Sequence, residues 1–152
     1  MRVSLKSVAV FAIMILTTTG LSACQQDLVL PSSDVDYCTI LADPPAKDGN
    51  QIAAFGRFRC DGKGADTITI KVSLQKQASN GSWKTLKSGT FVAHGSATSR
   101  SKSESQRTRK VLGACSKGHF RSVIHAVEKS KKHTQVYNNT SVFVPSPCNN
   151  EF

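Results

Sequence analysis

Five cysteines are the residues whose spacing says most about the chemistry of this chain. They stand at Cys24, Cys38, Cys60, Cys115 and Cys148. A four-thiolate zinc site uses closely spaced pairs such as C-x-x-C, and no two of these cysteines lie that close. The spacing therefore disfavours zinc and favours disulfide bonding. An odd number of cysteines in an exported chain leaves one thiol that needs another role.

The N-terminus has the three-part pattern of a secretory signal. Arg2 and Lys6 are the only charged residues over positions 1–23, and an uninterrupted apolar run covers positions 8–16. That run is too short to remain in a bilayer as a spanning helix. The pattern predicts export to an oxidising environment, where cysteines form disulfides.

The signal ends in Leu21-Ser22-Ala23-Cys24, which resembles a bacterial lipobox at all four positions. The resemblance implies a bacterial lipoprotein precursor that is cut before Cys24 and carries a diacylglyceryl group on the Cys24 sulfur. Two acyl chains are enough for stable membrane anchoring. The alternative is an ordinary secretory signal that is cut after Ser22, with Gly20 at position −3 and Cys24 an unmodified thiol.

Lipid on Cys24 leaves an even set of cysteines for disulfides. We predict that two bridges form among Cys38, Cys60, Cys115 and Cys148. Four cysteines allow three pairings, and all three stay open at this point. Each bridge would close a loop of tens of residues and contribute roughly 3 kcal/mol to stability.

Candidate catalytic groups are few. The histidines are His94, His119, His125 and His133. His119 and His125 would share one face of a strand, but about 20 Å apart, too far to bind one metal ion. No G-x-S-x-G elbow and no marked pair of carboxylates is present. We therefore predict a non-enzymatic protein without catalytic residues, metal or cofactor.

The charge is strongly positive and unevenly distributed. The chain carries +10, of which the signal contributes two charges. Residues 24–60 carry −2 and residues 61–152 carry +10. The candidate anion-binding residues are Arg100, Lys102, Arg107, Arg109 and Lys110 in one cluster, and Lys129, Lys131 and Lys132 in a second. Such cations attract anionic partners through salt-sensitive forces. The alternative for both clusters is a solvated loop.

The elements that must position these residues are mostly strands. A strand is predicted over residues 67–77, because apolar and polar residues alternate strictly from residue 67 to residue 75, and Asn80-Gly81 follows as a hairpin signal. Further strands are predicted over residues 52–60, 83–87, 90–94, 107–112, 119–127 and 136–144. A helix over residues 119–132 is the alternative there, but its β-branched residues favour a strand. Residues 43–50 are predicted to be a loop, and residues 96–110 a loop that leads into the strand over residues 107–112.

Short strands separated by turn signals predict a mostly β fold, a small antiparallel sandwich or barrel stabilised by two disulfides. Residues 1–23 would be the signal peptide, residues 24–36 the lipidated N-terminus and tether, and residues 37–152 a single extracytoplasmic β domain. For residues 25–36, a first edge strand is the alternative to a tether.

Together these features predict a lipid-anchored protein on the extracytoplasmic face of the cell membrane, with a binding or envelope-associated role for its basic surface. The expected partner, besides the membrane itself, is an anionic envelope polymer, a lipid headgroup or an acidic protein. Nucleic acid is not expected, because the chain is exported and aromatic residues do not interleave with its basic clusters. The alternative is a soluble secreted effector or toxin-like protein that acts on anionic envelopes.

Overall fold

Strands dominate the part of the chain that the structure describes. A computed structural model describes residues 37–131 and 133–148. In chain order the elements are β1 (Cys38–Asp48), β2 (Gln51–Cys60), β3 (Thr67–Gln77), β4 (Trp83–His94), the 3-10 helix η1 (Gly95–Thr98), α1 (Glu104–Arg107), β5 (Thr108–Ala114), β6 (His119–Ser130), β7 (His133–Thr140) and β8 (Val144–Pro145). Neither of these described helices is long and apolar enough to cross a membrane.

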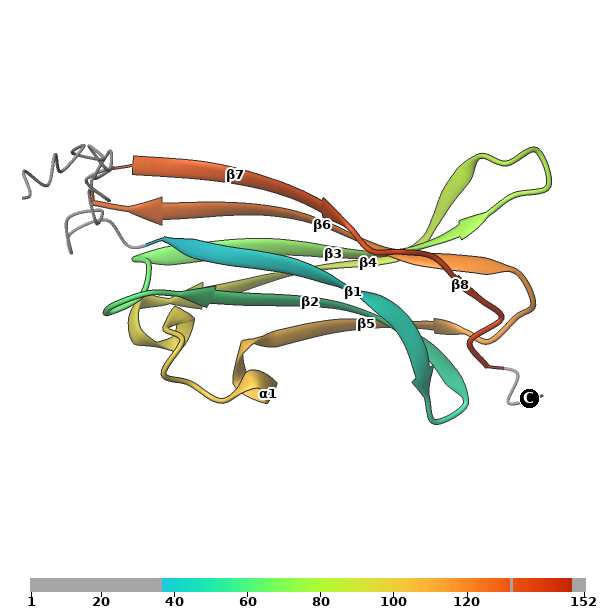
Figure 1. Ribbon diagram of the computed structural model, residues 1–152, viewed down its shortest axis with the longest axis horizontal. Coiled ribbons are helices and arrows are strands. Elements are labelled where there is room, and N and C mark those ends of the chain that lie inside the picture. Colours follow the sequence, from blue (N-terminus) through green and yellow to red (C-terminus); the bar gives the residue numbers. More distant parts are fainter. Residues whose placement is uncertain (1–36, 132, 149–152) are drawn as a thin grey trace, which may run out of the picture. The chain divides into compact units, whose positions relative to one another are not determined.

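The strands form two antiparallel sheets that face each other (Figure 1). One sheet has the order β1-β2-β5. The other has the order β4-β3-β6-β7, with the short β8 also paired to β6. The predicted fold, an antiparallel sandwich or barrel, is therefore confirmed as a sandwich, and its architecture follows from the alternating sequence pattern, which gives each sheet one apolar face to bury.

The core fills the space between the two sheets. Its largest fully buried apolar side chains are Ile52, Phe58, Ile68, Ile70, Leu74, Phe120 and Ile124. Burying a side chain of this size contributes roughly 1.5–3 kcal/mol relative to exposure. Gly56 faces inward on β2, where an added Cβ would lie 2.6 Å from Cδ1 of Ile124. The glycine therefore permits the close approach of the two sheets.

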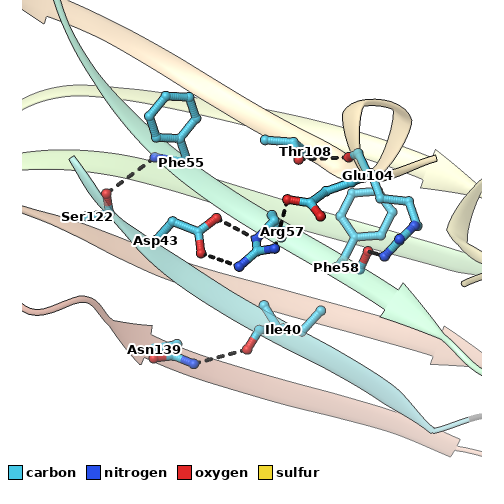
Figure 2. A network of polar contacts seen from close by, with 10 residues as sticks. Ile40, Asp43, Phe55, Arg57, Phe58, Glu104, Thr108, Ser122 and Asn139 are labelled. Atoms are coloured by element: carbon cyan, nitrogen blue, oxygen red, sulfur yellow. Dashed lines mark hydrogen bonds and ion pairs between the residues drawn. The ribbon is translucent and has the colours of Figure 1, made fainter. Parts of the chain in front are cut away.

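Polar side chains also join the sheets. The Phe55 N–H on β2 donates to Oγ of Ser122 on β6 at 3.3 Å. Nδ2 of Asn139 on β7 donates to the Ile40 carbonyl of β1 at 3.0 Å (Figure 2). These bonds tie the three-stranded sheet to β6 and β7 of the other sheet.

Several predicted boundaries are confirmed and others are wrong. Strand β3 covers residues 67–77 as predicted, and β6 is a strand, so the helical alternative is wrong. The strands predicted over residues 83–87 and 90–94 are one strand, β4, because pairing with β3 continues through Ser88 and Gly89. The predicted strand over residues 136–144 is instead two strands, β7 and β8.

Residues 43–50 are not the predicted loop, because β1 continues to Asp48 and only Gly49 and Asn50 form the turn. Pro44 and Pro45 fit in β1 for two reasons. The strand lies at a sheet edge, and its register with β2 shifts between Asp43 and Ala46. An edge strand at a register shift tolerates residues that have no N–H to donate.

The two disulfides are Cys38–Cys60 and Cys115–Cys148. Cys38 and Cys60 stand opposite each other in the β1–β2 ladder. The second bridge joins the β5–β6 connection to the segment after β8. The cysteines predicted to form disulfides are thus confirmed, and the fold selects one of the three pairings.

Candidate anion-binding surface

The first predicted basic cluster lies in the connection from β4 to β5 and in the first residues of β5, and several of its cations contact other groups of the domain. This stretch is not only a loop, because it contains η1 and α1. Nη1 of Arg100 lies 2.9 Å from Oδ1 of Asp61, and Nζ of Lys110 lies 2.5 Å from Oδ2 of Asp48. These two cations therefore already have carboxylate partners.

Arg107 and Arg109 hold the same connection to the sandwich. Arg107 Nε donates to the Lys102 carbonyl at 2.8 Å, and its Nη1 donates to the Phe58 carbonyl at 3.3 Å. Arg109 Nη1 donates to the Gln106 carbonyl at 2.8 Å, and its guanidinium lies 5.1 Å from the centroid of the Phe58 ring. Both guanidinium groups therefore have structural contacts. The Lys102 side chain is exposed.

Arg57 on β2 is a polar anchor that the sequence analysis did not single out. Its guanidinium contacts Asp43 through Nη2 at 2.7 Å and Nε at 2.6 Å, and Nη1 donates to Glu104 of α1 at 2.8 Å (Figure 2). The hydrogen bond to Asp43 is the main cause that raises the pKa of Arg57 above its ordinary value. The group fixes α1 against the three-stranded sheet.

The second predicted cluster lies at the connection between β6 and β7. Lys129 and Lys131 are exposed, and Lys132 lies outside the described residues. Lys129 stands between Thr67 of β3 and Thr134 of β7 in the sheet register. Its side chain therefore projects from the side of the five-stranded sheet that faces away from the core.

The outward-facing side chains of β4, β3, β6 and β7 form what we call the outer sheet face. Its cations and histidines are Lys71, Arg121, Lys129, His94, His119 and His125. In the described part of these four strands, no carboxylate stands at an outward position. Most other members are serine, threonine, asparagine, glutamine or valine. The face is thus cationic, with hydrogen-bonding side chains around its charges.

Arg121 on the outer sheet face is held by side chains of two other strands, Gln75 of β3 and Trp83 of β4. Its guanidinium lies 4.1 Å from the centroid of the Trp83 ring, and its Nε donates to Oε1 of Gln75 at 2.9 Å. Gln75 in turn donates to Oγ1 of Thr85 at 3.2 Å. Within the described residues, Nη1 and Nη2 of Arg121 have no protein hydrogen-bond partner. A guanidinium held in this way can bind a carboxylate or phosphate with two parallel hydrogen bonds.

The histidines do not form a metal site. His119 and His125 are both exposed on the outer side of β6, as predicted. His125 Nδ1 lies 2.9 Å from Oδ1 of Asn138, and His94 Nδ1 lies 3.3 Å from Oγ1 of Thr67. Across residues 37–131 and 133–148, no three histidine, cysteine or acidic side chains are placed to hold a metal ion.

Glu128 is a fully buried acid that the sequence analysis missed. Its carboxylate accepts hydrogen bonds from the Tyr137 hydroxyl at 2.6 Å, His133 Nε2 at 3.1 Å and Ser130 Oγ at 3.2 Å. Burial, followed by the bond to Glu128, raises the pKa of Tyr137 well above its ordinary value. The available signal was the alternation of β6, which puts Glu128 in phase with the strand's apolar residues. The cluster fixes the β6–β7 hairpin.

No protein-family model and no curated protein sequence matches this chain. The predicted signal peptide, the lipobox and Cys24 lie outside the described residues.

Proposed function

We propose that this chain is an exported lipoprotein that is anchored to the extracytoplasmic face of the cell membrane through Cys24. Its disulfide-bonded β domain binds an anionic polymer of the envelope and catalyses no reaction. Two observations support the location. The signal ends in a lipobox-like tetrad, and the domain has two disulfides, which are typical of oxidising compartments.

The balance of paired and unpaired charges carries the binding proposal. The described residues include 17 lysines and arginines but only six acids. Four of the acids are in ion pairs and a fifth is buried; in order they are Asp43, Asp48, Asp61, Glu104 and Glu128. The internal ion pairs thus consume most of the negative charge and leave a surplus of surface cations. Such a surface raises the encounter rate with anionic partners.

Lipidation is tested by measuring the intact mass of the protein recovered from the membrane fraction, for the native precursor and for Cys24→Ser. We expect a mature chain that begins at Cys24 with the added mass of the lipid, and loss of both processing and membrane retention in the variant. A water-soluble mature chain with an unmodified N-terminus would refute the anchor and favour the secreted-effector alternative.

Binding is tested by retention of the soluble mature chain, residues 24–152 with Cys24→Ser, on an immobilised acidic polysaccharide. We expect retention at about 50 mM salt that is lost at about 500 mM, because the Debye length falls below about 5 Å over that range. Retention that salt does not change, or no retention at low salt, would contradict the proposal.

A further inference from the structure

We infer that the outer sheet face, and not the first basic cluster, is the surface that binds the anionic polymer. We further infer that the polymer is an acidic polysaccharide. This inference rests on the proposed function and names its surface and ligand class. Four cations of the first basic cluster already contact carboxylates or backbone carbonyls: Arg100, Arg107, Arg109 and Lys110. Binding a polymer there would compete with these contacts.

The cations of the outer sheet face are spaced along one strip. Lys129 and Arg121 lie on the same side of β6, eight positions apart, or about 26 Å at 3.3 Å per residue. Lys71 of β3 stands beside His125 of β6, midway between them. A positive group therefore recurs about every 13 Å along the strand direction. This regular spacing suits an extended, linear polyanion better than a single small anion.

Each end of the strip offers a different kind of contact. At one end, Trp83 and Gln75 hold the Arg121 guanidinium, whose Nη groups have no partner within the described residues. This end can bind one carboxylate with two hydrogen bonds. At the other end, Lys129 supplies an exposed point charge between two threonines. The strip thus has an oriented site for one carboxylate at Arg121 and a less specific electrostatic attraction for the polymer at Lys129.

The side chains around these cations favour a sugar polymer. Hydroxyl and amide groups occupy many outward positions between them, including Thr69, Thr90 and Asn138. These groups donate and accept hydrogen bonds, as sugar hydroxyls do. Single-stranded nucleic acid is bound by stacking on several aromatic rings, and Trp83 is the one Trp, Tyr or Phe ring at the described outward positions.

The test compares two charge-matched variants of the soluble mature chain. The face variant carries Lys71→Gln, Arg121→Gln and Lys129→Gln. The control variant removes the same charge from exposed loop positions through Lys63→Gln, Lys102→Gln and Lys117→Gln. The probe is polygalacturonate, and its dissociation constant is measured by titration calorimetry at about 50 mM salt. Because exposed charge pairs contribute about 0.2–1 kcal/mol each, we expect about tenfold weaker binding for the face variant and less than about twofold for the control.

The outcomes separate the inference from the proposed function. If the parent chain binds no polygalacturonate at low salt, the proposed function itself is wrong. If the parent binds but both variants lose affinity equally, only the assignment to the outer sheet face is wrong. A thermal melt of each variant shows whether it is folded. If Arg121→Gln unfolds the domain, the double variant Lys71→Gln and Lys129→Gln is compared with a matched double control. That comparison still tests whether the outer sheet face binds the polymer.

A second set of ligands tests the class of polymer. Single-stranded DNA, vesicles that contain anionic lipid, and neutral dextran are titrated under the same conditions. We expect dextran not to bind, and the difference between face and control variants to be largest for polygalacturonate. A difference of equal size for DNA or for the vesicles would overturn the assignment to a polysaccharide.

Discussion

The Tyr137→Phe substitution tests the buried cluster around Glu128. It deletes the hydroxyl that donates to the carboxylate at 2.6 Å and leaves the ring in place. Glu128 has 0% exposed area, so water cannot replace the lost donor without rearrangement. A hydrogen bond to a charged group contributes about 1.5–3 kcal/mol. We expect the free energy of unfolding to fall by that amount.

The assay is urea denaturation of the soluble, disulfide-bonded mature chain near pH 7. For a slope of about 2 kcal/mol per molar urea, the midpoint should fall by about 1 M. Tyr37→Phe is the matched control, because Tyr37 is 51% exposed and should change stability by less than about 0.5 kcal/mol. Equal midpoints for Tyr137→Phe and the parent would refute the reasoning about the cluster.

The raised pKa of Tyr137 also predicts a pH dependence. The folded state holds this proton more tightly than the unfolded state, in which the pKa of tyrosine is about 10. The stabilisation is therefore complete below pH 10 and is lost as the pH rises above it, by at most about 1.4 kcal/mol per pH unit. The stability difference between the parent and Tyr137→Phe should shrink from pH 9 to pH 11. A difference that stays constant would contradict the raised pKa.

Three further predictions concern packing, a disulfide and an ion pair. Gly56→Ala places a methyl group 2.6 Å from the opposite sheet, so a urea titration should show about 1–3 kcal/mol of destabilisation; an unchanged midpoint would argue against the close approach. Replacing Cys38 and Cys60 together by serine should lower the free energy of unfolding by about 3 kcal/mol. An unchanged urea midpoint would show that the bridge does not form. Asp43→Asn should lower the free energy of unfolding by about 1 kcal/mol, because the substitution weakens a partly buried ion pair with Arg57. A higher free energy of unfolding for this variant would contradict the prediction.

Local patterns predicted the strands well where one face is buried. The alternation over residues 67–75 predicted β3, because each outward side chain there is polar and each inward one is apolar. The density of turn residues was misleading at Pro44 and Pro45, where it predicted a loop and the structure has a strand. Whether a proline is tolerated depends on whether its strand lies at an edge, and only the sheet order shows that β1 does.

The proposed binding surface could be predicted less well from the sequence. The sequence shows where cations cluster but not which of them meet an acid. Lys110 pairs with Asp48, 62 positions away in the chain, and Arg100 pairs with Asp61, 39 positions away. Lys71 lies outside both basic clusters of the sequence and was therefore not predicted as an anion-binding residue. Only the registers of β3 and β6 show that Lys71 lies midway between two other cations.

The most direct test of the account maps the bound polymer on the protein. The soluble mature chain, labelled with 15N, is titrated with short oligomers of galacturonate, and the amide and Arg side-chain shifts are followed by NMR. We predict that the largest changes occur around Lys71, Arg121 and Lys129, on β3 and β6. Changes confined to residues 99–110, the first basic cluster, would contradict the central claim.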